Sequence, residues 1–303
     1  MHIAVIGPGG IGCLFAGLLA EAGHEVTLVD RRPERAALIA REGLVIEGNG
    51  QERTVALRAS AFPAACGPAE LIILCVKAHE TAGTAPSVSA LAAPGAKLLC
   101  LQNGLGRPDV FGRIPGKDCL FAGVTTHGTT VLGLNHVRHA GAGQTVIGAL
   151  GHDRPGAEAL AKIFSEAGIE SAATADTDGM LWSKLVINAA ICPVSVLAGQ
   201  PNGELIRAGH WRDLLRRAAE ESAAVAAARG VRLAFPDPVL ATEEVCRKTA
   251  PNLSSMLQDV RRGRRTEIDE INGAIVRAAT ELGLEAPVNR MLCEKIVEIE
   301  RRK

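Results

Sequence analysis

Short hydrophobic runs recur along the first part of the chain and end at glycine, acidic or amide residues. Four of them cover residues 2–6, 25–30, 71–76 and 97–102, a length typical of strands buried on both faces of a parallel sheet. Between the runs, the pattern predicts helices over residues 10–22, from Pro33 onward and over roughly 80–91. This alternation predicts a doubly wound parallel sheet.

The pattern changes after about residue 119 and again after about residue 175. Glycines first separate short β-rich pieces, which we interpret as antiparallel edge strands over 120–126, 136–139 and 145–147. A helix near 155–167 and a strand near 170–173 would complete this domain. Beyond it only helical patterns remain, and they cover 176–199, 204–229, 235–248, 264–283 and 286–301. Pro193 lies inside the first of these and predicts a kink or a break.

We therefore expect an α/β protein with two domains. Residues 1–174 would form a Rossmann-type dinucleotide-binding domain and residues 175–303 an all-α domain that holds substrate and catalytic groups. The chain has 303 residues, of which 47% are hydrophobic, so it can bury a large core.

Composition excludes several classes of partner. Lys and Arg together number 33, as do Asp and Glu, so the formal charge is zero and favours neither nucleic acid nor an anionic membrane. The N-terminus lacks the basic segment of a signal peptide, and we expect no apolar run that spans a bilayer. None of the eight cysteines forms a C-x-x-C pair, so we expect reduced thiols in a cytoplasmic protein and no metal site. The helical domain could supply a homodimer face, although no pattern identifies one.

The most informative motif is the turn Gly7-Pro8-Gly9-Gly10-Ile11-Gly12, directly after the first strand and before the first helix. In a dinucleotide-binding turn the first glycine permits the tight bend, and the second lets the backbone approach a pyrophosphate. The third allows the helix to pack closely on the strand, and the helix N-terminus faces the phosphates. We predict that this turn binds a nicotinamide dinucleotide.

The residues after the second strand leave the choice of dinucleotide open. Asp30 ends that strand, where a carboxylate can bind the ribose hydroxyls of NAD. Arg31 and Arg32 follow and could instead bind the 2′-phosphate of NADP.

Other polar residues lie where chemistry is expected. Lys77 and Asn103 follow two core strands, and ligands of open α/β sheets bind at the carboxyl ends of strands. Lys184, Asn188 and Cys192 are four residues apart and share one face of a very apolar helix.

Further short motifs follow in order along nearly the whole chain. They are Val76-Lys77-Ala78, Gln102-Asn103-Gly104-Leu105-Gly106, Thr125-Thr126-His127-Gly128, Leu181-Trp182 with Lys184-Leu185 and Asn188, Pro201-Asn202-Gly203-Glu204-Leu205, Ser254-Ser255-Met256-Leu257-Gln258-Asp259, and Thr266-Glu267-Ile268-Asp269 with Ile271-Asn272-Gly273. Together with the glycine turn, this series resembles the ketopantoate reductase (2-dehydropantoate 2-reductase) family of pantothenate biosynthesis.

The resemblance implies hydride transfer from NADPH to the C2 carbonyl of a 2-keto acid. It makes Lys184 the general acid that protonates the developing alkoxide, and Glu267 the residue that orients the substrate hydroxyl and supports the lysine. It further implies substrate amides at Asn103 and Asn188, positions near the substrate carboxylate or cofactor at Asn252 and Ser255, and cofactor contacts from Arg31, Lys77 and Asn103.

The chain departs from the family pattern at two positions. Cys192 stands where a second asparagine is usual, and a thiol is a weak hydrogen-bond partner, so one substrate contact is lost. Asp30 precedes the NADP-binding arginine and should disfavour a 2′-phosphate, so NAD(H) is an alternative cofactor. A second hypothesis is therefore a D-2-hydroxyacid dehydrogenase for another branched or aromatic 2-keto acid. A dinucleotide sensor without catalysis is less favoured, because a sensor needs no proton donor.

Overall fold

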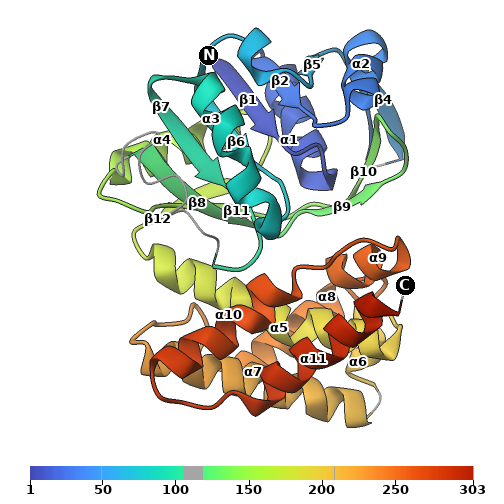
Figure 1. Cartoon of the computed structure of the whole chain (residues 1–303), viewed down its shortest axis with the longest axis vertical. Coiled ribbons are helices and arrows are strands. Elements are labelled where there is room, and N and C mark those ends of the chain that lie inside the picture. Colours follow the sequence, from blue (N-terminus) through green and yellow to red (C-terminus); the bar gives the residue numbers. More distant parts are fainter. Residues whose placement is uncertain (49, 106–118, 208, 303) are drawn as a thin grey trace. The chain divides into compact units, whose positions relative to one another are not determined.

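The computed structural model describes residues 1–48, 50–105, 119–207 and 209–302. The chain forms two compact units (Figure 1). The first comprises Met1–Gln102 and Gly106–Thr177, and the second comprises Asn103–Leu105 and Asp178–Lys303. The short segment Asn103–Leu105 thus belongs to the helical unit, although it directly follows a strand region of the first.

The main sheet of the first unit has the order β12-β11-β8-β7-β6-β1-β2-β5. Its strands are β1 (His2–Ile6), β2 (Glu25–Val29), β5 (Arg58–Ser60), β6 (Ala69–Leu74), β7 (Ala92–Cys100), β8 (Leu120–Thr125), β11 (Thr145–Ala149) and β12 (Ser171–Thr174). All neighbours are parallel except β8 and β11. The strand order reverses at β1, which has β2 on one side and β6 on the other, so the predicted doubly wound sheet is confirmed.

Alternating side chains of the strands build two cores, one on each face of the sheet. Ile3 and Val5 pack with α1 (Gly10–Glu21) and α4 (Arg154–Glu166). Ala4 and Ile6 pack on the other face with α3 (Ala85–Leu91). The two-residue period of a strand explains this division. The remaining helical segments of the unit are α2 (Pro33–Glu42) and two 3-10 segments, η1 (Pro63–Ala65) and η2 (Ala78–Thr84).

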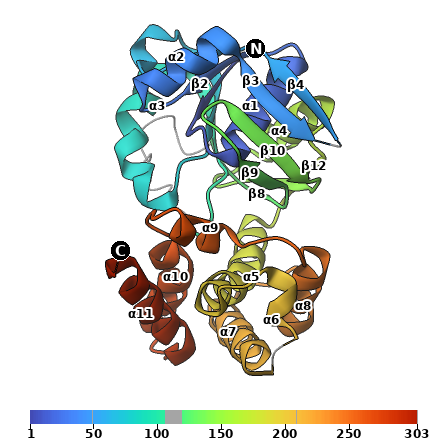
Figure 2. The same ribbon diagram turned by 90° about the vertical axis from the view of Figure 1, so that its right-hand side faces the viewer.

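A second, four-stranded sheet has the order β4-β3-β10-β9. Its strands are β3 (Leu44–Gly48), β4 (Gln51–Val55), β9 (Gly128–Val131) and β10 (His136–Gly141), and Figure 2 shows them beside α1. Of the four strands only β10 was predicted, and β5 of the main sheet was not predicted either. Residues 120–126 pair antiparallel with β11, as expected, but β8 is not an edge strand, because it also pairs in parallel with β7 inside the main sheet. Local alternation does not reveal which distant strand will pair.

The second unit is helical, as predicted. Its helices are α5 (Thr177–Ala198), α6 (Asn202–Leu205), α7 (Gly209–Ala228), α8 (Pro238–Lys248), α9 (Ser255–Arg261), α10 (Ile268–Glu281) and α11 (Pro287–Arg301). Apolar side chains of α5 enter two core clusters, with Leu185 and Ala189 in one and Val186 and Ala190 in the other. Burial on most sides explains why this helix is apolar almost all round.

The helical patterns predicted for this unit did not include α9, which Ser254 caps by accepting a hydrogen bond from the Leu257 N–H at 3.1 Å. Of the kink or break expected at Pro193, a break does not occur, because α5 runs through it. Contrary to the expectation about apolar runs, α5 is long and apolar enough to cross a membrane. Most of it is buried inside the second unit, which accounts for its composition.

Candidate functional site

The glycine turn joins β1 to α1, next to the end of β6. Gly7 has a φ of +99°, which favours glycine, and a Cβ there would lie 2.6 Å from the Val76 nitrogen. A Cβ on Gly12 would lie 2.1 Å from the Gly7 oxygen. A Cβ on Gly9 would meet no protein atom nearer than 4.0 Å. Packing within the protein therefore requires glycine at 7 and 12, and a Cβ on Gly10 would also lie 2.3 Å from Thr129 Oγ1, while the backbone at Gly9 is open to an approaching ligand.

The first turn of α1 has no side-chain cap at its N-terminus. Its first N–H groups and the helix dipole therefore suit an anionic group such as a pyrophosphate. The turn lies where the strand order reverses, which is the usual ligand position in a doubly wound sheet. The turn from Gly7 to Gly12, which includes Pro8, Gly10 and Ile11, therefore has the backbone geometry that suits the pyrophosphate of a dinucleotide.

Lys77 follows β6 and starts η2 in extended backbone conformation. The Gln102 side-chain amide donates to the carbonyls of Val76 and Lys77 at 3.1 and 3.4 Å, and to Thr81 Oγ1 at 2.6 Å. Gln102 therefore holds the backbone around Lys77 beside the glycine turn.

The end of β2 carries a compact group of charges. Asp30 is only 2% exposed, and its Oδ1 accepts a hydrogen bond from the Arg32 N–H at 3.0 Å. Its Oδ2 lies 3.4 Å from Arg35 Nη1 and 3.5 Å from Arg32 Nη2. The side chain of Arg31 is 81% exposed and pairs with Glu80 at 2.7 Å.

Sequence reasoning missed Arg35. It is 6% exposed, and its Nε donates to the Leu134 carbonyl at 2.5 Å while Nη2 lies 3.5 Å from Cys13 Sγ. A buried arginine is rare without a partner. Its position in the first turn of α2, after an acid at the end of a strand, was a signal that could have identified it.

In the second unit, Lys184 and Glu267 form the candidate acid pair. Burial lowers the pKa of Lys184 from its ordinary value, and the charges of Glu267 and Cys192 oppose that shift. Glu267 is 4% exposed and immediately precedes α10. Its Oε2 accepts a hydrogen bond from Asn103 Nδ2 at 3.1 Å. The structure thus brings three predicted residues, 103, 184 and 267, into one electrostatic group.

The other predicted substrate residues differ in their environments. Asn188 is partly buried on α5, one turn after Lys184, and Cys192 is buried one turn further. Ser255 is exposed in the first turn of α9, and the Asn252 carbonyl accepts from the Asn202 N–H at 2.9 Å. The buried hydroxyl in this region is that of Ser254, which lies 2.5 Å from Ser195 Oγ.

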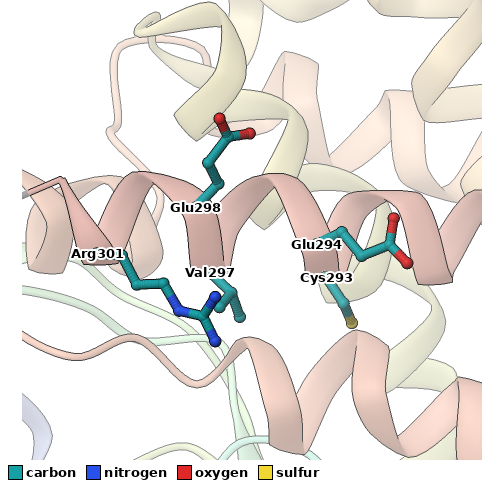
Figure 3. A pocket seen from close by; sticks show the side chains of 5 residues that line it. All are labelled: Cys293, Glu294, Val297, Glu298 and Arg301. Carbon is teal, nitrogen blue, oxygen red and sulfur yellow. The ribbon is translucent and has the colours of Figure 1, made fainter.

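A separate hollow lies along α11 and is lined by Cys293, Glu294, Val297, Glu298 and Arg301 (Figure 3). None of the predicted site residues lines it. Among the described residues, no group of three or more His, Cys, Asp or Glu side chains could hold a metal ion. The candidate chemistry therefore rests on the glycine turn and on the group around Lys184.

Two protein-family models match successive parts of the chain. Residues 3–152 match the family model "Ketopantoate reductase PanE/ApbA", and residues 176–300 match "Ketopantoate reductase PanE/ApbA C terminal". The 2-dehydropantoate 2-reductase of Halobacterium salinarum is 34% identical, over 98% of this chain and 98% of that protein.

Two solved structures also resemble the chain along its length. A PanE/ApbA family ketopantoate reductase from Ralstonia eutropha is 37% identical with a TM-score of 0.89, covering 100% of this chain and 99% of that one. A D-mandelate dehydrogenase in complex with NADH and anilino(oxo)acetate is 26% identical with a TM-score of 0.94 and the same coverage. The family models and the curated relative together show that this chain belongs to the ketopantoate reductase family, a family of dinucleotide-dependent reductases.

Proposed function

We propose that the chain reduces 2-dehydropantoate to D-pantoate, the reaction for which its curated relatives are named. The observation that carries the proposal is a lysine with a lowered pKa coupled to a buried glutamate that accepts a hydrogen bond from Asn103. That arrangement suits the protonation of an alkoxide. The absence of a C-x-x-C pair among the eight cysteines of the sequence supports a cytoplasmic enzyme.

The residues of the chain have distinct roles in this reaction. A reduced dinucleotide held at the Gly7–Gly12 turn would supply the hydride that the C2 carbonyl carbon accepts. Lys184 gives a proton to the C2 oxygen and stabilises its developing negative charge. Glu267 orients the substrate hydroxyl and favours the ammonium form of Lys184. Asn103 and Asn188 bind substrate through their amides. Asn252 and Ser255 lie near its carboxylate or the cofactor, and Cys192 lies on the same helix face as Lys184 and Asn188.

A panel of 2-keto acids tests this assignment. The enzyme is assayed with ketopantoate, 2-ketoisovalerate and phenylglyoxylate, each with NADPH and NADH. We expect the highest kcat/KM for ketopantoate. A higher value for phenylglyoxylate would favour the D-2-hydroxyacid dehydrogenase hypothesis, and no turnover of any of them would overturn the proposal.

For the cofactor, we infer a preference for NADP(H). Asp30 is the residue that would favour NAD(H), but its carboxylate is covered and lies between two guanidinium groups. Arg31 and Arg32 are exposed beside it. The exposed pair between Arg31 and Glu80 contributes little in water, so a doubly charged 2′-phosphate can displace it.

Dissociation constants for NADPH and NADH test this preference. We expect tighter NADPH binding, and Arg31→Ala should weaken NADPH by about 10-fold or more without changing NADH, since a charge-assisted hydrogen bond contributes about 1.5–3 kcal/mol. Arg58→Ala, which removes another exposed ion-paired arginine of the first unit, is the matched control. Tighter binding of NADH by the wild type would contradict the inference.

A further inference from the structure

Pro193 creates a specific problem in the middle of α5. In a regular helix the carbonyl of residue 189 accepts a hydrogen bond from the N–H of residue 193, and proline has no N–H. Ala189 is fully buried, so water cannot replace the missing donor. An unpaired buried carbonyl destabilises the folded chain, because it loses its hydrogen bond to water without gaining another.

Asn272 of α10 supplies the missing donor. Its Nδ2 donates to the Ala189 carbonyl at 2.8 Å and also to Asn289 Oδ1 at 2.8 Å. Both asparagines are fully buried. Asn289 in turn donates to Glu221 Oε1 at 2.7 Å and to Ser222 Oγ at 3.2 Å. One amide therefore connects α5 to α10, and a chain of amides connects both to α7 and α11.

The two helices joined in this way carry the candidate acid pair. Ala189 directly follows Asn188 and lies five residues after Lys184 on α5. Asn272 lies five residues after Glu267, which immediately precedes α10. A sliding or rotation of one helix against the other changes the separation of Lys184 and Glu267. A misplacement of about 1 Å can lower a rate by about 10²-fold.

We propose that Asn272 is a positioning residue, which holds α5 and α10 in the register that couples Lys184 to Glu267. The proposal rests on the roles of Lys184 and Glu267 in the proposed function. Asn272 acts through the carbonyl orphaned by Pro193. Asn272 belongs to the motif that begins at Thr266, and the proposed hydride transfer gave it no role. The positioning of α5 against α10 gives it one.

The test removes the amide and then restores a donor by a different route. Asn272→Leu keeps the side-chain size and leaves the Ala189 carbonyl unpaired. We expect kcat to fall about 10-fold or more. The alkaline limb of the profile of kcat against pH reports the pKa of Lys184. It should move to lower pH, because the Glu267 carboxylate then stabilises the Lys184 ammonium less. NADPH affinity should stay unchanged, because the glycine turn belongs to the other unit.

Pro193→Ala provides the second arm. An alanine at 193 offers an N–H to the Ala189 carbonyl, so the double variant Asn272→Leu/Pro193→Ala should recover at least half of the lost kcat and the position of the alkaline limb. Pro193→Ala alone should remain within about twofold of the wild type. If Asn272→Leu does not fold, Asn272→Ser, whose short side chain cannot reach the Ala189 carbonyl, takes its place, and the same fall in kcat and shift of the alkaline limb are expected for it.

Three results would overturn the proposal. One is a lower Tm for Asn272→Leu with kcat per folded molecule and the alkaline limb unchanged, which is a purely structural effect. The second is a double variant that regains stability without activity, and the third is one that neither folds nor works. Failure of the proposed function itself is distinguishable, because it appears in the wild type as a lack of turnover, or in Lys184→Ala as an unchanged kcat.

Discussion

Water stabilises an ammonium group, and Lys184 is removed from much of that water on a helix whose side chains are mostly buried. Desolvation lowers the pKa of this lysine, whereas the carboxylate of Glu267 favours its charged form. The balance makes Lys184 a better proton donor than a surface lysine while retaining an anionic partner beside it. At the scale of one residue, the surroundings determine the chemistry.

Removal of the amine should lower kcat by about 10²-fold or more in Lys184→Ala, the usual contribution of a general acid. In the wild type, kcat should fall as the pH rises through the pKa of Lys184, below the ordinary 10.5, because the proton donor is lost. Glu267→Gln removes the charge that raises this pKa, so its alkaline limb should shift to lower pH. Steady-state assays across the pH range measure both effects.

The control is Lys248→Ala, which removes an exposed lysine of the same unit that pairs with Glu244. It should leave kcat and the limb as in the wild type. A limb that stays in place in Glu267→Gln would mean that the carboxylate does not act on Lys184.

At the scale of an element, the N-termini of α11 and α1 differ in how their first N–H groups are paired. The first N–H groups of a helix have no partner within it. α11 receives the carboxylate of Glu221 from α7, which accepts from the N–H groups of Val288 and Asn289 at 2.9 and 2.8 Å. α1 has no side-chain cap. The capped terminus holds the helical unit together, and the uncapped one is open to a phosphate.

Gly9→Ala tests the open terminus. The new methyl group meets no protein atom nearer than 4.0 Å and φ is −70°, so the Tm should stay near that of the wild type. It projects where the pyrophosphate approaches, so the Kd for the dinucleotide should rise about 10-fold or more. Calorimetric titration and thermal melts give the two quantities.

Gly12→Ala is the matched comparison, because its methyl group would lie 2.1 Å from the Gly7 oxygen. It should lower the Tm as well as the affinity. Wild-type affinity in Gly9→Ala would place the phosphates elsewhere.

Glu221→Ala tests the capped terminus. It removes the acceptor for two backbone N–H groups and for the Asn289 amide. The free energy of unfolding should fall by about 1–2 kcal/mol, the scale of a lost cap. Urea denaturation measures it, with Glu220→Ala on the exposed face of α7 as a control. Equal stability of the two variants would show that the cap contributes nothing.

At the scale of the whole molecule, the course of the chain assembles the acid group. Asn103 follows β7 of the first unit, yet it belongs to the helical unit and donates to Glu267, which is 164 residues away. Gly104 next to it has a φ of +83°, and a Cβ there would lie 2.3 Å from the Glu270 carbonyl. This close crossing of the segment over the Glu270 backbone requires glycine at 104, and it places the Asn103 amide beside Glu267.

Asn103→Asp tests the importance of this crossing. A second carboxylate would replace the donor 3.1 Å from Glu267 Oε2, and two such groups hold a proton between them. We expect kcat/KM for the 2-keto acid to fall about 10-fold or more, with a new titration on the acid side of the pH profile. Assays on that side of the profile, against Asn103→Ala, separate charge from simple loss of the amide. A profile identical in the two variants would rule out a contact with the ionised glutamate.

The residue patterns alone determined much of this protein. Short continuous apolar runs determined which segments become β1 and β2, because strands of a parallel sheet are buried on both faces, and helical patterns predicted α1 and α5. The Gly7–Gly12 turn was readable because its chemistry is local. The family resemblance rested on motifs in the right order, and the comparisons confirmed it.

Tertiary structure decided whatever depends on partners distant in sequence. The pairing of β3 with β10, the covering of Asp30 by Arg35 and the hydrogen bond from Asn103 to Glu267 have no local pattern. Pro193 is the clearest case. Its missing N–H predicted a kink or a break, and α5 continues without a break while an asparagine 79 residues later in the chain donates to the carbonyl that lacks a helix partner. The sequence alone shows that Pro193 leaves a helix carbonyl without its donor. Only the folded chain shows that the Asn272 side chain donates to that carbonyl.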